Sequence, residues 1–487
     1  MRARPSQAPA EDTARGPAAL GRARRKVIPI AAVSGGLYAA HRKIYPRSIS
    51  GRFSMLRWWM VAATQLVFYG LPWLQWGQRQ AVLFDLGARR FYLFGLVLYP
   101  QDLIYLTGLL VVSALSLFLF TAVAGRLWCG YTCPQTVYTE IFMWVEQKIE
   151  GSRIARMRLD GEALSMEKLV KKWFKHLVWL GIALWTGFSF VGYFTPIREL
   201  GMEFLQTRMG SWEVFWVFFY GFATYGNAGF MREQVCTYMC PYARFQGAMF
   251  DRDTLIVSYD VARGEPRGLA KKGEPAPGYG DCIDCDLCVQ VCPTGIDIRN
   301  GSQYECIGCG LCVDACNTVM QRIKKPAGLV RYATQNGMAG RWTPAQVWRR
   351  VARPRVLIYT AVLAALCIGL MASLVARSTF KVDVVRDRGS LAHLVAGGRL
   401  ENVYRLQIMN ATERVQRYRV SAEGLAGLST EPAQDIAVDP AASRWVAVRV
   451  QAPFDAAAPG AHPIRFVVQQ DEGAARIVEQ TTFIVPR

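Results

Sequence analysis

Long apolar runs separated by polar and basic loops fill the chain up to residue 376. Five such runs stand out, over residues 56–76, 103–125, 176–194, 214–230 and 356–376. A helix that crosses the hydrocarbon core of a bilayer, about 30 Å thick, needs roughly 20 apolar residues. The pattern therefore predicts an α-helical bundle of five transmembrane helices, of which 214–230 is the shortest.

Beyond residue 377 apolar and polar positions alternate in steps of two, which is typical of half-buried strands. The alternation is clearest in "VYRLQI", "RWVAVRV", "IRFVV" and "IVEQTTFIV". The turn-rich stretch "QQDEGAAR" joins the last two and favours a hairpin. We expect a C-terminal all-β immunoglobulin-like sandwich over 378–487. This region contains no cysteine, so packing alone must stabilise it.

Charge along the chain orients the predicted helices. The 487 residues carry a formal net charge of +20, and basic residues concentrate before the first apolar run and between the second and third. Since cationic loops resist translocation, the N-terminus is expected in the cytoplasm and residues 378–487 in the periplasm. Arg79, Arg89 and Arg90 depart from the rule, because they fall in a loop assigned to the outside. The excess charge favours contact with anionic membrane lipid over nucleic-acid binding, since no nucleic-acid motif accompanies it.

A second interpretation of the N-terminus makes residues 27–40 the apolar core of a cleaved signal peptide, which would invert the first helix. Ser34, Gly35 and Gly36 interrupt that run, and a basic stretch follows it. The pattern therefore favours a basic cytoplasmic tail.

Two cysteine runs, "CIDCDLCVQVCP" from Cys282 and "CIGCGLCVDACN" from Cys306, repeat the spacing C-x2-C-x2-C-x3-C. In two-cluster ferredoxins the last cysteine of each run crosses to the other cluster. The spacing predicts two [4Fe–4S] clusters in an inserted α+β dicluster ferredoxin-like module. The first cluster would be held by Cys282, Cys285, Cys288 and Cys316, and the second by Cys306, Cys309, Cys312 and Cys292. Zinc is the alternative, but a doubled eight-cysteine pattern is far more specific than a C-x2-C pair.

Four further cysteines form the motifs "CGYTCP" and "CTYMCP", which follow the second and fourth apolar runs. The four-residue spacing of Cys129 with Cys133, and of Cys236 with Cys240, puts both sulfurs of a pair on one side of a helix. Proline after the second cysteine disfavours helical geometry there. Thiolates are soft ligands for Cu(I), zinc or iron–sulfur iron, and the two pairs either converge into one site or act as separate dithiols. The thirteenth cysteine, Cys367, lies alone in the fifth run and is expected only to pack.

Missing motifs narrow the chemistry. The chain has no C-x2-C-H haem-attachment motif and only four histidines, too few at the apolar runs for a cytochrome b. No G-x-G-x-x-G motif opens a strand–helix unit, so no nicotinamide or flavin site is visible.

Taken together, both C-x3-C-P motifs, the ferredoxin runs, the sandwich and "KIYPRSISGRFSMLRW" before the first apolar run resemble the cbb-type cytochrome c oxidase accessory family, known as CcoG, FixG or RdxA. The resemblance spans nearly the whole chain, with only residues 1–35 unmatched. It implies a multi-pass protein of the bacterial cytoplasmic membrane that acts as a cupric reductase and supports copper-centre assembly of the oxidase. Copper would be substrate or transient ligand, and its reduction would fall on Cys129, Cys133, Cys236 and Cys240.

The resemblance also implies partners in the oxidase assembly machinery and among copper-transport or chaperone proteins. It leaves the electron donor open and allows a homodimer. The domain division expected on this basis is a tail over 1–54, a four-helix membrane domain over 55–255, the ferredoxin-like domain over 256–345, the fifth helix over 346–377 and the sandwich over 378–487.

Two other functions stay open at this point. The first is an electron-transfer subunit of a membrane quinol dehydrogenase, similar to the NapH and NosR group, which shares the thiol motifs and the ferredoxin run but lacks the fifth helix and sandwich. The second is a non-redox scaffold that docks oxidase subunits through the sandwich, with structural clusters.

Overall fold

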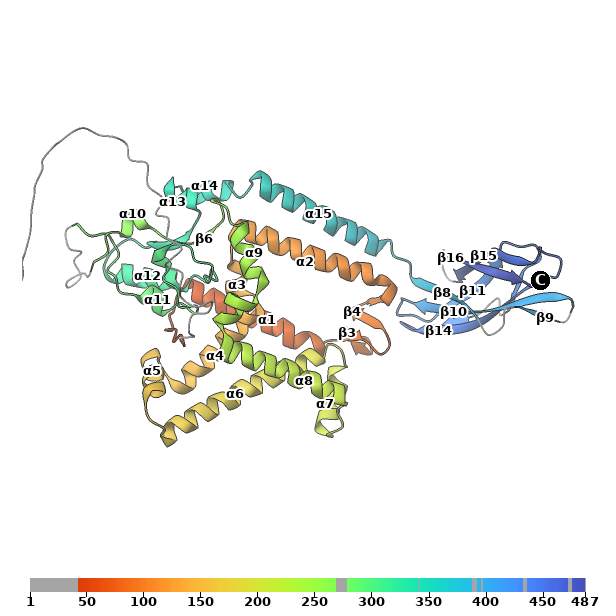
Figure 1. Ribbon diagram of the computed structural model, residues 1–487, viewed down its shortest axis with the longest axis horizontal. Helices are drawn as coiled ribbons and strands as arrows, with labels where there is room; N and C mark the ends of the chain where they lie inside the picture. The colour runs from red at the N-terminus through yellow and green to blue at the C-terminus, as the bar shows by residue number, and fades with distance from the viewer. Residues whose placement is uncertain are drawn as a thin grey trace, which may run out of the picture. The chain divides into compact units, whose positions relative to one another are not determined.

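The computed structural model, shown in Figure 1, describes residues 43–268, 278–340, 342–387, 392–395, 397–431, 436–471 and 475–486. The chain divides into two compact units, Met1–Ile44 and Tyr45–Arg487, and the architecture below is that of the second. The signal-peptide interpretation of 27–40 lies outside the described residues. The five-domain division stays a prediction.

Among the described residues, three helices are long and apolar enough to cross a membrane: Pro100–Ala124, Met166–Val191 and Pro354–Val375. They coincide with the second, third and fifth predicted runs. The first and fourth runs are helical, as α1 (Arg52–Gly70) and α8 (Ser211–Thr224), but five transmembrane helices are not confirmed. The first helix carries arginine at two positions, and α8 has only 14 residues before its backbone widens into a π-helix.

Small and polar residues let the long helices approach one another. Gly187 of α6 (Met166–Val191) faces the carbonyl of Val217 in α8, so closely that a Cβ there would clash with the carbonyl oxygen. The α2 helix (Leu103–Ala124) lies beside α15 (Pro354–Val375) in Figure 1, and the Tyr105 hydroxyl donates to the Ser373 carbonyl at 3.1 Å. Close backbone approach of this kind is how apolar helices pack without a hydrophobic driving force.

A small β-structure lies between α1 and α2, where the sequence predicted only a loop. Two tight turns build it, because Arg89 and Phe94 adopt left-handed backbone with φ of 55° and 53°. Single residues that take up this conformation carry no strong sequence pattern, so alternation did not reveal the strands. They are β1 (Gln75–Trp76) with β2 (Arg79–Gln80), and an antiparallel sheet of β3 (Val82–Asp85), β4 (Arg90–Leu93) and β5 (Leu96–Leu98).

The ferredoxin-type region combines one small sheet with short helices, as the predicted α+β module requires. Strands β6 (Ile256–Tyr259) and β7 (Val330–Ala333) pair antiparallel. Helices α11 (Leu287–Gln290) and α12 (Leu311–Arg322) each begin two residues after the second cysteine of a run. Cysteines pack into the apolar core here, so the core of this region is built around its candidate ligands.

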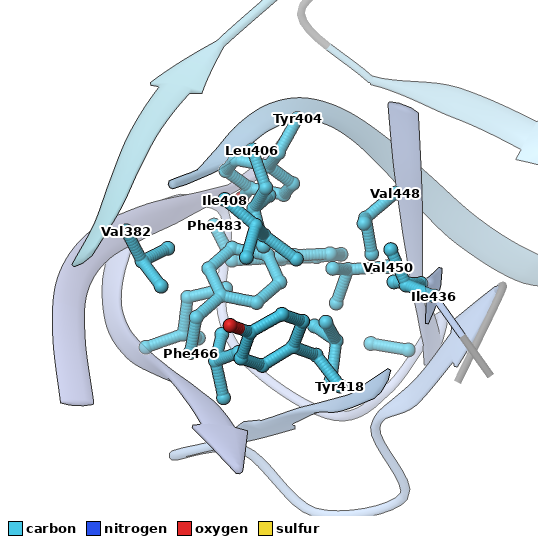
Figure 2. Close-up of a cluster of buried hydrophobic side chains, with 14 of the residues drawn as sticks. Val382, Tyr404, Leu406, Ile408, Tyr418, Ile436, Val448, Val450, Phe466 and Phe483 are labelled. Carbon is cyan, nitrogen blue, oxygen red and sulfur yellow. The ribbon is translucent and has the colours of Figure 1, made fainter. Parts of the chain in front are cut away.

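The C-terminal region is all-β, which confirms that part of the predicted fold. One sheet has the order β12-β14-β10-β8, with β9 also paired to β10, and the other has the order β13-β11-β15-β16. Figure 2 shows the aromatic and branched side chains that fill the space between them, with the Tyr404 and Phe466 rings 5.0 Å apart. The expected hairpin joins β15 to β16. The strands are β8 (Phe380–Arg386), β9 (His393–Val395), β10 (Arg399–Asn410), β11 (Gln416–Glu423), β12 (Ser429–Glu431), β13 (Ile436–Val438), β14 (Ser443–Pro453), β15 (Gly460–Gln470) and β16 (Arg476–Val485).

The remaining helices connect these parts. They are α3 (Leu127–Tyr131), α4 (Pro134–Glu150), α5 (Arg153–Gly161), α7 (Ile197–Leu205), α9 (Pro241–Met249), α10 (Val261–Gly264), α13 (Gln335–Ala339) and α14 (Pro344–Arg349), the 3₁₀ turns η2 (Leu71–Trp73), η3 (Pro100–Asp102) and η6 (Ile298–Asn300), and the π-helices η4 (Tyr225–Met231) and η5 (Val235–Met239).

Candidate metal centre

The two ferredoxin-type runs repeat a backbone shape as well as a spacing. Each has left-handed residues on both sides of its second cysteine, Asp284 and Asp286 in the first run and Gly308 and Gly310 in the second. Glycine adopts this conformation without strain, whereas aspartate does so at some cost. In the first run the Arg299 guanidinium holds both aspartates, at 2.6 Å from Asp284 and 2.5 Å from Asp286.

The eight cysteines of the runs line two small cavities. The first three cysteines of the first run line one cavity together with the last cysteine of the second run. The first three cysteines of the second run line the other cavity together with the last cysteine of the first run, as crossed pairing predicts. Cys282, Cys285, Cys288 and Cys316 line the first cavity, while Cys292, Cys306, Cys309 and Cys312 line the second, which Cys288 also reaches. The assignment of these cysteines as ligands stays a prediction.

The chemistry of the cavities fits iron–sulfur clusters. Burial raises the pKa of the Cys288 and Cys309 thiols to about 12, because an apolar setting penalises the thiolate. Bound iron would replace the proton of each thiol and neutralise the charge of the buried thiolate, so metal binding would stabilise such a site. Among the described residues, no three His, Cys, Asp or Glu side chains are spaced to hold a single metal ion. Cubane ligands stand farther apart than those of one zinc ion, so the cavities suit clusters better.

The two C-x3-C-P motifs have the same local structure, which differs in one respect from the predicted one. The amide of Cys133 donates to the Trp128 carbonyl at 3.1 Å, and the amide of Cys240 donates to the Val235 carbonyl at 2.8 Å. Each bond spans five residues, wider than an α-helical turn, so the cysteines of a pair do not share one α-helix face. As predicted, helical geometry stops at the second cysteine, and proline opens the next helix.

The four thiols of these motifs lie close enough to interact electrostatically. Burial raises the pKa of Cys236 to about 12, with further contributions from Cys133, Cys129 and Cys240. Burial and Cys133 raise the pKa of Cys129 to about 11, although the Cys129 thiol donates to the Gln246 side chain at 3.5 Å. The structure thus brings the two motifs to one place.

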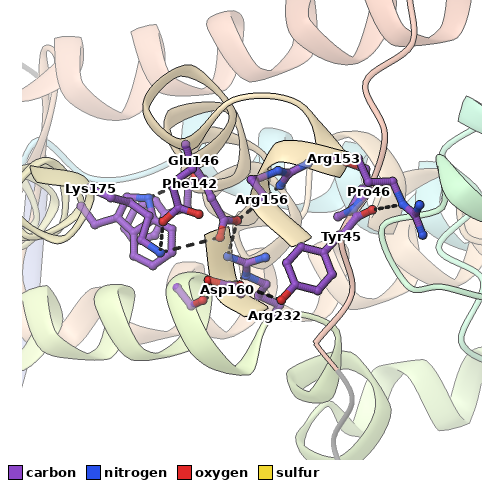
Figure 3. Close-up of polar contacts among 12 residues, drawn as sticks. Tyr45, Pro46, Phe142, Glu146, Arg153, Arg156, Asp160, Lys175 and Arg232 are labelled. Carbon is purple, nitrogen blue, oxygen red and sulfur yellow. Dashed lines mark hydrogen bonds and ion pairs between the residues drawn. The ribbon is translucent and has the colours of Figure 1, made fainter. Parts of the chain in front are cut away.

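A buried side-chain network joins the two motifs. Gln135, just after the first motif, donates to the carbonyls of Asn227 (2.9 Å) and Arg232 (3.0 Å), just before the second. Arg232 has left-handed backbone and pairs with Glu146 of α4 at 2.9 Å. Figure 3 shows the ion-pair cluster around Glu146, to which Lys175 also belongs.

The first motif also contacts the second ferredoxin run directly. A Cβ at Gly130 would lie 2.8 Å from the Ile307 carbonyl oxygen and 2.9 Å from the Cys309 Cα, so only glycine fits this approach. The Tyr131 hydroxyl donates to the Cys309 carbonyl at 2.9 Å. Arg126 Nη1 donates to the Cys306 carbonyl at 3.3 Å.

Sequence reasoning missed these supporting residues. The signal available was an arginine three or four positions before each motif, in "GRLWC" and "MREQVC", and the glycine inside "CGYTC". Isolated arginine and glycine residues are common near helix ends, so neither stood out.

Three protein families match parts of the chain. A family described as "4Fe-4S binding domain" matches residues 106–151, and one described as "4Fe-4S dicluster domain" matches residues 231–335. A family described as "IG-like fold at C-terminal of FixG" matches residues 370–486. The first match contains the Cys129 and Cys133 pair, and the second contains the other ten motif cysteines.

Named relatives match most of the chain. Protein RdxA of Cereibacter sphaeroides is 42% identical over 407 residues, which is 81% of this chain and 85% of the relative. Nitrogen fixation protein FixG of Rhizobium meliloti is 36% identical over 441 residues, 84% of each chain. A crystal structure of a FixG-related protein from Vibrio parahaemolyticus matches 22% of this chain and 97% of that one, at 27% identity and a TM-score of 0.21. The iron–sulfur matches, the apolar helices and these relatives together show that the chain is a membrane protein belonging to the FixG and RdxA family of iron–sulfur electron-transfer proteins.

Proposed function

We propose that this protein passes electrons from its two clusters to the four C-x3-C-P thiols, where Cu(II) is reduced to Cu(I). The observation that supports this route is the contact of the first motif with the second ferredoxin run. Gly130 packs on the backbone at Cys309, and Tyr131 donates to the same residue. This direct contact makes the path for an electron between the two segments short.

The bound clusters would supply single electrons. Cys129, Cys133, Cys236 and Cys240 supply soft ligands, which favour Cu(I) over Cu(II) and therefore drive the reduction. Each Cu(II) takes up one electron to become Cu(I), and a cluster held by Cys292, Cys306, Cys309 and Cys312 would supply that electron. The thiols release their protons when copper binds, because the thiolate is the ligand.

We further propose that the Cu(I) serves copper-centre assembly of the cbb-type oxidase. The receiving proteins would belong to the oxidase assembly or copper-transport machinery, and the electron donor is a separate redox partner. Family membership and the donor chemistry of the thiols support this role.

The topology follows the charge pattern: residues 1–54 and the ferredoxin region in the cytoplasm, and residues 378–487 in the periplasm. Reporter fusions after Arg377 test it. A periplasmic reporter should be active there and a cytoplasmic reporter silent; the reverse result would overturn the topology and place the thiols on the other side.

The copper site is tested by paired substitutions. Cys129→Ala with Cys133→Ala, or Cys236→Ala with Cys240→Ala, should leave about eight iron and eight sulfide per chain, as two [4Fe–4S] clusters require. The rate of Cu(II) reduction should fall at least tenfold in both variants, and oxidase activity should drop in copper-starved cells. Cys367→Ala, which removes the lone cysteine of α15, serves as the matched control and should reduce Cu(II) normally.

Two outcomes would contradict this assignment. Wild-type Cu(II) reduction in both double variants would move copper to another site. A wild-type protein with about twelve iron, of which about four disappear in either double variant, would show that the thiols hold a third cluster instead of copper.

A further inference from the structure

Arg126 carries a buried charge between the two sets of thiols. It lies in the turn between α2 and α3 and is 6% exposed. Its Nη2 donates to the Ala243 carbonyl at 2.7 Å and its Nη1 to the Cys306 carbonyl, while Nε is buried without a hydrogen-bond partner. The guanidinium therefore contacts uncharged carbonyls, and among the described residues it forms no ion pair with a carboxylate.

Thiols of both kinds surround this charge. Burial lowers the pKa of Arg126. Negative charge at nearby groups raises it, in the order Cys129, Cys306, Glu305 and Cys236. Cys306 belongs to the second ferredoxin run, whereas Cys129 and Cys236 belong to the two C-x3-C-P motifs. Arg126 thus lies between the second cluster site and the proposed copper site.

Two other arginines buried near these sites differ from Arg126 because each pairs with a glutamate. Arg57, which interacts electrostatically with Cys309 and Cys292, pairs with Glu140 at 3.1 Å. Arg232 pairs with Glu146 at 2.9 Å. A buried charge without a counter-ion is unfavourable, and proteins offset it with hydrogen bonds or with a nearby anion. For Arg126 the anionic groups nearby are the thiolates that would hold metal, together with the Glu305 carboxylate, which acts without forming an ion pair.

We propose that Arg126 is a positioning residue for electron transfer, which fixes the Cys306 loop against the first C-x3-C-P motif and whose positive charge raises the reduction potential of the second cluster. This inference rests on the proposed electron route. A fixed cation stabilises the reduced cluster, because that state carries one more negative charge. The electron then moves to Cu(II) on the other side of the same cation. Arg126 keeps its proton throughout, so the step transfers an electron alone.

The test is a redox titration of the anaerobically purified full chain, with the reduced clusters followed by EPR. Arg126→Met removes the charge and keeps most of the volume. We expect about a tenfold shift of the second cluster toward its oxidised form at fixed potential, which is about 59 mV for a one-electron centre. Arg126→Lys keeps the charge and should restore a potential near that of the wild type. A merely structural role would not separate these two variants.

The matched control is the double variant Arg57→Met with Glu140→Gln. It removes a buried arginine near the same cluster together with its counter-ion, so the net charge is unchanged and the potential should stay at the wild-type value. Iron content near eight per chain confirms that the clusters are loaded. If Arg126→Met loses iron, Arg126→Gln takes its place in the titration.

The proposal is overturned if the charge-removing variant, loaded with iron, has the wild-type potential, or if Arg126→Lys shifts it equally. The titration uses no copper, so its result is independent of the copper assignment. Loss of Cu(II) reduction in the double cysteine variants together with an unchanged potential in Arg126→Met would refute this inference alone.

Discussion

The two C-x3-C-P motifs share a local structure but differ in what they contact. Both end in a hydrogen bond that spans five residues, and both are followed by a helix that starts with proline. In the first motif the residue after the first cysteine is Gly130, which packs on the second ferredoxin run, whereas Thr237 takes that place in the second. The arginine before the first motif, Arg126, donates to the Cys306 carbonyl and forms no ion pair within the described part of the chain, whereas Arg232 before the second pairs with Glu146.

This difference indicates that the two copies of the motif have different structural roles. The first motif is fitted to the ferredoxin region by the close backbone approach at Gly130, which leaves no room for a side chain, and by the Tyr131 hydroxyl. The second is fixed to the helices by buried ion pairs and by Gln135. Damage to the second motif's contacts should therefore loosen the helices first, and damage to the first motif's contacts should release iron first.

The largest effect is expected from Glu146, which is fully buried and interacts with Arg156, Lys175 and Arg232. Glu146→Gln removes the charge that these cations share, and breaking a buried pair costs about 3–5 kcal/mol. Thermal unfolding followed by far-UV circular dichroism should show a clear loss of helix stability at normal iron content. Glu167→Gln, at an exposed ion pair with Lys171, should leave unfolding unchanged. Equal behaviour of the two variants would show that the buried cluster does not anchor the second motif.

The next effect breaks the first motif's contact. Gly130→Val would force side-chain atoms into the backbone of Ile307 and Cys309, and overpacking of this kind costs about 3 kcal/mol. Because the strained segment carries a candidate ligand, we expect loss of about half the iron, measured per chain after anaerobic purification. Thr237→Val, at the same place in the second motif, is the matched control and should keep full iron. If the Gly130→Val protein keeps its full iron content, the backbone at Ile307 and Cys309 can move to accept the larger side chain without loss of a cluster.

The sequence predicts the parts of the site that repeat and misses those that occur once. Cysteine spacing predicts the two cavities and their crossed membership, because ligand geometry fixes spacing directly. Alternation predicts the long strands such as β10 and β14, each of which buries one face. It does not predict the short sheet around Phe94 or the contact at Gly130, because each depends on a single backbone conformation or on residues far along the chain. The first and fourth helices show the same limit: their apolar composition was visible, but not that α8 would turn into a π-helix.

A smaller effect tests the link between the motifs. Gln135→Leu removes three hydrogen bonds, to the carbonyls of Asn227 and Arg232 and to the Thr139 hydroxyl, and each is worth about 1 kcal/mol. We expect a modest loss of helix stability, and a drop in Cu(II) reduction because the two thiol pairs are no longer held together. Gln147 lies on the same helix as Gln135, and Gln147→Leu removes an exposed hydrogen bond to Ser48. This variant should change neither the helix stability nor the rate of Cu(II) reduction. Normal copper reduction in Gln135→Leu would show that the pairs stay together without this link.

The smallest effect concerns Tyr131, whose hydroxyl bonds to the Cys309 carbonyl at 2.9 Å. Tyr131→Phe removes this hydrogen bond and the longer one to the Tyr332 hydroxyl at 3.4 Å. The loss of about 1 kcal/mol at the Cys309 carbonyl corresponds to a factor of about five in an opening equilibrium. Iron should therefore leave the variant about five times faster under a chelator. Tyr404→Phe removes a similar bond, to the Thr482 carbonyl at 2.8 Å, in the sandwich, where no iron is expected. That variant should lose iron at the wild-type rate, because its weakened bond opens a region without candidate ligands. If both variants release iron equally fast, the tyrosine does not couple the first motif to the second cluster site, and the two motifs differ less than their contacts indicate.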